Sequence, residues 1–330
     1  MRNKRNILIG VIFLMIILII ICKTNSEKKV LQIDIGYQSV TSQTWSALII
    51  KNQGIFEKKL KDKYKDKKIK IVWHDEISGA VINTSMISNK IQIGFMGDMP
   101  LILNMYKADT IDSYDALIIA FDGKGELGKN QSIIVSKDSK IKSLKDLEGK
   151  TISTPIGSSA HYMLLKVLEK NNLLEKVKIV HQDVALASQL LKTKKTDAFS
   201  IWAPYPNFLV AEGDAKVLVG GEESEIDYLA GVIVNNKWAK ENDEIVKLFL
   251  ESLDEAHEFI REDEEGAAKI FSLESGFDKK ITEKEVSNIN WDRNIEEDDV
   301  ETLKDKQKFL INLEQIKNFD IDKYIYKGGY

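Results

Sequence analysis

Short apolar runs alternate along this chain with stretches in which apolar residues recur at helical spacing. Strands are predicted at 30–35, 69–73, 91–95 and 116–121. Helices are predicted between them at 45–50 and 80–87, and from Leu101 onward. The loops that follow the strand ends are polar and carry glycines. Strands and helices that alternate at this spacing indicate an α/β fold with a largely parallel sheet.

A stretch with three glycines, 122–130, predicts a hinge, and a second α/β set follows it. Its strands are predicted at 132–135, 151–154, 177–181, 198–201 and 216–219. A further strand at 232–234 is expected to return the chain to the first α/β set. The remainder, including the tail to Tyr330, is predicted to be helical.

The junction after the strand at 151–154 is the first candidate site. Pro155 and Gly157 break the strand, and a helical pattern begins directly after them. Ser158 or Ser159 is expected to cap this helix, because a serine hydroxyl accepts a hydrogen bond from a free N–H of the first turn. Free N–H groups and the positive end of the helix dipole favour a small anion. The alternative is an ordinary capped strand–helix junction.

The N-terminus carries the pattern of an export signal. Basic residues precede Ile7–Ile21, which is apolar except for Gly10 and is shorter than the roughly 20 residues that span a bilayer. Cys22, the one cysteine of the chain, follows directly. Segment 1–22 is therefore predicted to be a signal peptide with a bacterial lipobox, lipidated at Cys22, and 23–29 a polar tether. Ile21 departs from the lipobox pattern, so an uncleaved anchor is the alternative.

Composition and motifs narrow the function classes. Charged residues make up 30% of the chain and the net charge is -4, without a basic stripe, so nucleic acid is not an expected partner. The four histidines are scattered, none of them at metal-binding spacing, and we predict neither a metal nor a cofactor. No phosphate loop, dinucleotide fingerprint or nucleophile elbow occurs. These features favour binding over catalysis.

Eight segments in order resemble the solute-binding proteins of bacterial ABC importers for aliphatic sulfonates, taurine and nitrate, the NMT1/THI5-like family. The segments are Ile35–Gln38, Gly54–Glu57, Ser78–Gly79, Ile93–Pro100, Leu144–Lys150, Pro155–Tyr162, Asp197–Pro204 and Glu225–Leu229. The resemblance implies a two-lobed periplasmic-binding-protein-like fold of type II, with two hinge crossovers and mixed, largely parallel sheets flanked by helices. Lobe 1 would comprise 30–125 and 232–330, and lobe 2 would comprise 126–231.

The resemblance also implies the function. The protein would be a monomer on the extracytoplasmic face of the membrane that captures a small organic anion and delivers it to a permease and an ATPase. Alternatives are a pyrimidine (thiamine-precursor) binder, a synthase-like enzyme on the same fold, and an extracellular sensor module. Asp98 departs from the family pattern, in which a small neutral residue is frequent, and this disfavours a plain inorganic anion such as nitrate.

The expected ligand-binding residues lie in the loops of both lobes. They are Gln38, Ser78, Gly79, Gly97, Asp98, Gly157, Ser158, Ser159, His161, Trp202 and Asp227. Asp98 would pair with the amine of a zwitterion, or instead cap the helix that follows. Trp202 would form an apolar wall, or instead belong to the core. His161 would donate to the anion, or instead bond to a neighbouring loop.

Overall fold

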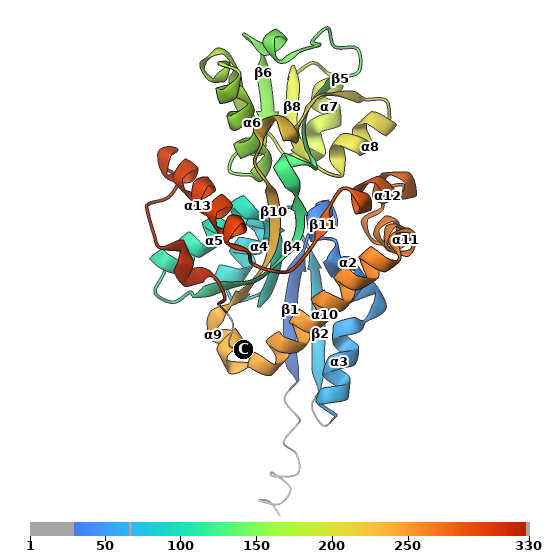
Figure 1. Ribbon diagram of the computed structural model, residues 1–330, viewed down its shortest axis with the longest axis vertical. Coiled ribbons are helices and arrows are strands. Elements are labelled where there is room, and N and C mark those ends of the chain that lie inside the picture. Colours follow the sequence, from blue (N-terminus) through green and yellow to red (C-terminus); the bar gives the residue numbers. More distant parts are fainter. Residues whose placement is uncertain (1–29, 66–67, 328–330) are drawn as a thin grey trace, which may run out of the picture.

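A computed structural model describes residues 30–65 and 68–327 (Figure 1). The predicted export segment 1–22, Cys22 within it and the tether 23–29 lie outside the described residues. Two β-sheets, each flanked by helices, lie at opposite ends of the molecule, and long strands run between them. This arrangement confirms the predicted α/β, two-lobed fold.

The lower sheet in Figure 1 has the strand order β11-β4-β10-β3-β1-β2. Its strands are β1 (Leu31–Tyr37), β2 (Ile69–Asp75), β3 (Ile93–Gly97), β4 (Ala116–Gly125), β10 (Tyr228–Asn235) and β11 (Asn290–Trp291). The helices between the first strands are α2 (Ser46–Gln53), α3 (Ile55–Lys63), α4 (Gly79–Ile87) and α5 (Asp98–Thr110). After β10 come α9 (Asn236–Glu241), α10 (Asp243–Glu262), α11 (Glu264–Ser275), α12 (Lys279–Ser287) and α13 (Glu297–Asn312).

The upper sheet has the order β7-β6-β8-β5-β9. Its strands are β5 (Gln131–Ser136), β6 (Thr151–Thr154), β7 (Lys178–His181), β8 (Ala198–Trp202) and β9 (Ala215–Gly220). Its helices are α6 (Ser159–Lys170), α7 (Ala187–Lys192) and α8 (Tyr205–Ala211). Every strand predicted from the sequence is present, with ends shifted by up to four residues.

Both sheets are mixed, and parallel pairing is less dominant than predicted. Among the described strands β1 pairs in parallel with β2 and β3, and β6 pairs in parallel with β7 and β8. The other pairings are antiparallel. In the lower sheet β10 returns from the upper lobe and inserts between β3 and β4 in the opposite direction. In the upper sheet β5 runs antiparallel to both of its neighbours, β8 and β9.

The stretch 122–130, predicted as a hinge, begins within a strand, because β4 continues to Gly125. Its last residues pair with the start of β10, so β4 and β10 run together between the lobes (Figure 1). Gly123 serves close packing here: a Cβ atom at this position would lie 2.7 Å from the carbonyl oxygen of Gln43. The chain leaves the strand only at Glu126.

The tail also differs from the prediction. Helix α13 ends at Asn312, and turns with one 3-10 helix (Ile321–Tyr324) follow. Glu314 adopts a left-handed conformation, with φ 56°, which a continuing α-helix does not allow. Ile316, Phe319 and Ile321 are nevertheless buried against α5 and its neighbours, so apolar contacts hold the tail although no α-helix continues there.

Candidate functional site

A cavity of about 300 Å³ lies between the two lobes. Its walls come from the ends of β1, β3, β6 and β8 and from the first turns of α4, α5 and α6. The lining residues are Gln38, Thr41, Ser78, Gly79, Ala80, Asn83, Gly97, Pro100, Leu103, Pro155, Ile156, Gly157, Ser158, Ser159, His181, Asp183, Trp202, Tyr228 and Gln315. The cavity therefore lies outside the carboxyl ends of parallel strands, where α/β sheets bind ligands.

Eight of the residues predicted from the sequence line this cavity together. They are Gln38, Ser78, Gly79, Gly97, Gly157, Ser158, Ser159 and Trp202. Their elements explain the convergence: Gln38 follows β1, Gly97 ends β3 and Trp202 ends β8. Loops that are far apart in the sequence thus meet at one interlobe surface.

Helix N-termini from both lobes meet at the cavity, those of α4 and α5 from the lower lobe and that of α6 from the upper lobe. Ser158 is the N-cap of α6, and its hydroxyl oxygen accepts a hydrogen bond from the His161 N–H at 3.2 Å. Gly157 precedes it with φ 83°, a conformation that favours glycine. Ser78 is the N-cap of α4, and its side chain makes no capping bond. The N-termini of α4 and α6 both offer backbone N–H groups and a partial positive charge to a bound anion.

Polar side chains link the two lobes across the cavity. The Trp202 Nε1–H donates to the Thr41 hydroxyl at 3.1 Å, and this hydroxyl lies 3.4 Å from Gln38 Oε1. Gln38 Nε2 in turn donates to the Phe95 carbonyl at 3.3 Å, which leaves a second amide proton on the same nitrogen. Trp202 is 6% exposed, so it serves as cavity wall and as part of the hydrophobic core.

Three predicted residues lie outside the lining. Asp98 is fully buried behind Ser159 and forms an ion pair with Lys306. His161 is 6% exposed; its Nδ1 accepts the Gly157 N–H at 3.3 Å, and burial lowers its pKa to about 4. Asp227 accepts the Leu127 N–H at 2.6 Å. Asp98 is the first residue of α5, and Gly97 is the N-cap, so Asp98 does not occupy the capping position given above as its alternative role.

Sequence reasoning missed several lining residues. Thr41 and Gln315 lie on segments without a motif, and Gln315 reaches the cavity from the tail. Tyr228 lies within the family-like segment Glu225–Leu229, but Asp227 was chosen there instead. Burial raises the pKa of the Tyr228 phenol well above its ordinary value, so this side chain is neutral at physiological pH. His181 and Asp183 complete the upper wall. Their position at the end of β7 was the one available signal, because the carboxyl ends of β1, β3, β6 and β8 also carry lining residues.

Among the described residues that line the cavity there is neither lysine nor arginine. A bound anion would thus be held by backbone N–H groups, hydroxyls and the Gln38 amide. Among the residues that the structure describes, no group of three or more His, Cys, Asp or Glu side chains could hold a metal ion. Within those same residues, 30–65 and 68–327, no helix combines the length and apolarity that crossing a membrane requires.

The chain is similar to a family of known proteins and to several individual relatives. Residues 128–267 match the model of the NMT1/THI5 like family. This match confirms the family resemblance predicted from the sequence. The chain is also 28% identical over 301 residues to a putative aliphatic sulfonates-binding protein of Bacillus subtilis, covering 91% of this chain and 86% of the relative. It is 29% identical over 190 residues to the taurine-binding periplasmic protein of Escherichia coli, covering 56% of each chain.

Solved structures agree on the fold. The alkanesulfonate-binding protein SsuA from Xanthomonas axonopodis pv. citri, bound to MOPS, superposes with a TM-score of 0.75 at 21% identity. It covers 89% of this chain and 98% of its own. The periplasmic aliphatic sulphonate binding protein SsuA from Escherichia coli gives a TM-score of 0.74 at 20% identity, with 90% and 98% covered. Both show the two-lobed binding-protein architecture described above.

Proposed function

We propose that this protein is the solute-binding component of an ABC importer, and that it captures a small organic anion of the aliphatic sulfonate class in the interlobe cavity. The observation that carries the proposal is the meeting of two helix N-termini, those of α4 and α6, at one cavity. The named relatives that bind sulfonates and taurine support the same ligand class.

The chemistry of the lining fits an anionic head group with an apolar tail. Unpaired N–H groups of both helix ends, together with the Gln38 amide, would solvate the sulfonate oxygens without a cationic side chain. Pro100, Leu103 and Ile156 offer the apolar surface that an alkyl chain buries. Taurine and nitrate are the further candidates, and the ligand's length is the variable to screen.

The two serines at the start of α6 have different roles in this proposal. The Ser158 oxygen already accepts the His161 N–H, so its own proton is free to be donated to the ligand. The Ser159 hydroxyl donates to Asp98 Oδ1 at 2.5 Å, so its proton is committed elsewhere. Ser158 is therefore the residue whose hydroxyl we expect to contact the anion, and Ser159 contributes its backbone N–H.

The remaining parts of the proposal concern the whole molecule. Lobe 1 (30–125 and 232–330) and lobe 2 (126–231) would close around the ligand, with β4 and β10 as the two hinge crossovers. A lipid on Cys22 would hold the protein as a monomer on the extracytoplasmic face of the membrane, next to its permease and ATPase. Relatives described as periplasmic support the location.

Calorimetric titration of the full-length chain in mild detergent tests the proposal. Ethanesulfonate, longer alkanesulfonates, taurine and nitrate are the titrants. Loss of one charge-assisted hydrogen bond in Ser158→Ala costs roughly 1.5–3 kcal/mol, which weakens sulfonate binding by roughly 10- to 150-fold. The ligand should be recovered unchanged after incubation, since turnover would indicate an enzyme instead.

Ser143→Ala is the matched control. Ser143 also caps a helical turn of the upper lobe, with Asp146 as its capping-box partner, but it does not line the cavity. Each substitution removes one N-cap at about 1 kcal/mol of stability, and only Ser158→Ala should weaken binding. Equal affinities in the two variants, or no heat with any anion, would refute the proposed site.

A further inference from the structure

Asp98 lies behind the cavity wall, and its carboxylate accepts hydrogen bonds from four donors. Its Oδ1 accepts the Met99 N–H at 2.7 Å and the Ser159 hydroxyl at 2.5 Å. Its Oδ2 accepts the Leu229 N–H at 2.9 Å and the Lys306 ammonium. Because these four donors occupy both oxygens and the residue is fully buried, Asp98 is not available to a ligand amine.

The donors come from parts of the chain that move separately if the lobes open. Ser159 belongs to the upper lobe and lines the cavity, whereas Asp98 begins α5 in the lower lobe. Leu229 lies on the crossover strand β10, and Lys306 lies on α13 in the C-terminal part of the chain. The Lys306 ammonium also donates to the Asp227 carbonyl at 2.5 Å and is 2% exposed.

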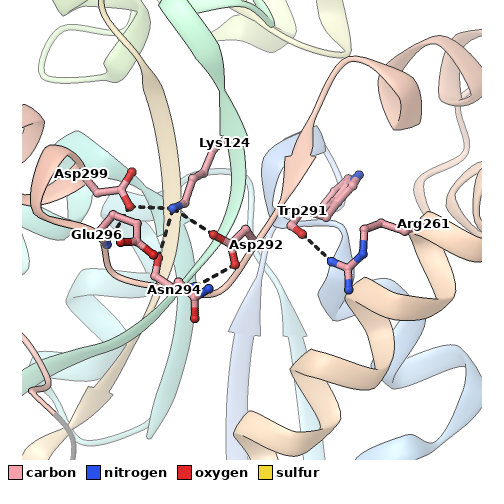
Figure 2. A network of polar contacts seen from close by, with 7 residues as sticks. All are labelled: Lys124, Arg261, Trp291, Asp292, Asn294, Glu296 and Asp299. Atoms are coloured by element: carbon pink, nitrogen blue, oxygen red, sulfur yellow. Dashed lines mark hydrogen bonds and ion pairs between the residues drawn. The ribbon is translucent and has the colours of Figure 1, made fainter.

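A second buried lysine–aspartate pair ties the same C-terminal part to the other crossover. Lys124 on β4 bonds Asp299 at 2.6 Å and the Asn294 carbonyl at 3.1 Å, with Asp292 at 3.6 Å (Figure 2). Lys124 and Asp299 are 9% and 8% exposed in their side chains. Within the described contacts of Lys124, none of the partners lines the cavity. Both pairs are buried lysine–aspartate ion pairs, but only the Asp98–Lys306 pair contacts a residue that lines the cavity, Ser159.

We propose that Asp98 and Lys306 are positioning residues that form a latch on Ser159 and hold the cleft closed over the ligand; this inference rests on the proposed function. Lys306 and the Leu229 N–H fix one oxygen of Asp98 from behind, which presents the other oxygen to the Ser159 hydroxyl. When the upper lobe closes, this hydroxyl replaces water on the carboxylate, and the first turn of α6 is brought to the ligand. Ligand affinity then includes the free energy of the latch.

Ethanesulfonate titrations of the full-length protein in mild detergent, measured where every variant is folded, test the latch. Lys306→Met leaves Asp98 without its cation and should weaken ethanesulfonate binding by at least tenfold. Lys124→Met breaks the comparable pair on the other crossover; it should lower the unfolding temperature by a similar amount and leave the affinity within twofold of wild type. Equal affinities in the two variants would overturn the latch.

The double variant Asp98→Asn/Lys306→Met separates positioning from stability. With both charges removed, the unfolding temperature should recover most of its loss, whereas the affinity stays at least fivefold reduced because a neutral amide holds Ser159 less tightly. If the unfolding temperature and the affinity recovered together, the Asp98–Lys306 pair would only stabilise the fold and would not position Ser159.

Hydrogen exchange without ligand completes the test. Peptides covering 97–101 and 157–163 should exchange several-fold faster in Ser159→Ala and Lys306→Met than in wild type or Lys124→Met. Unchanged exchange in both would overturn the latch. If wild type binds no sulfonate, the proposed function fails, and this exchange comparison still decides on the latch.

Discussion

His161 should make the stability of this protein sensitive to mild acid. Burial lowers the pKa of its imidazole from 6.5 to about 4, because the charged form loses its hydration. In the unfolded chain the imidazole takes up its proton near pH 6.5, whereas in the folded protein it remains neutral until about pH 4. A group with a depressed pKa contributes stability that is complete above the unfolded pKa and is lost as the pH falls through this window.

The size of the effect follows from the two pKa values. A difference of about 2.5 units at 1.36 kcal/mol each corresponds to about 3 kcal/mol in total. Roughly 2 kcal/mol of this should be lost between pH 7 and pH 5. His161→Asn isolates the contribution, since an amide oxygen can replace Nδ1 as the acceptor of the Gly157 N–H and does not titrate in this range.

Urea unfolding of wild type and His161→Asn at half-unit steps from pH 5 to pH 7.5 measures the difference. The smaller Asn side chain lowers stability by an amount that does not depend on pH, so the comparison concerns slopes alone. The wild-type free energy of unfolding should fall by about 2 kcal/mol more than that of the variant. Parallel curves would refute the argument, because the imidazole would then titrate alike in both states.

Two glycines of the cavity wall should respond differently to an added methyl group. A Cβ atom at Gly79 would lie 2.6 Å from Cβ of Pro100, within one lobe, so Gly79→Ala should cost about 1–2 kcal/mol in urea unfolding after the helix propensity of alanine is counted. An unfolding midpoint at or above that of wild type would contradict this clash. At Gly97 the added atom would lie 3.2 Å from the Ser159 hydroxyl of the opposite lobe. Gly97→Ala should therefore weaken ethanesulfonate binding a few-fold in calorimetry with little change in urea unfolding, and a loss of stability without a loss of affinity would speak against an interlobe contact.

Local patterns were enough to predict the strands, the helix start at Ser158 and most loops of the site. The reason is that the carboxyl ends of parallel strands share one edge of a sheet, so Gln38, Gly97 and Trp202 had to lie near each other or face each other. A helix C-terminus at Gly54 was equally predictable, since this residue adopts a left-handed conformation with φ 61°.

Features that depend on distant contacts were not predictable. Asp98 was expected to meet a ligand amine or to cap the following helix. The structure instead places it against Lys306, 208 residues away, on a helix without a motif of its own. Gln315 reaches the cavity only because apolar side chains anchor a non-helical tail. The sequence did not reveal that the first residues of the predicted hinge, 122–125, belong to β4 and that β10 pairs with this strand as far as Gly125. In each case the decisive partner comes from another part of the chain.

The insertion of β10 between β3 and β4 has a consequence for synthesis. Strands β1, β2 and β3 pair locally, but they cannot join β4 until Tyr228–Asn235 has emerged, more than 100 residues after β4 begins. The upper sheet, in contrast, is built from one continuous segment, β5 to β9. During synthesis the upper sheet should thus be completed before the lower sheet. Until β10 is made, strand β3 keeps an open edge that needs protection from aggregation.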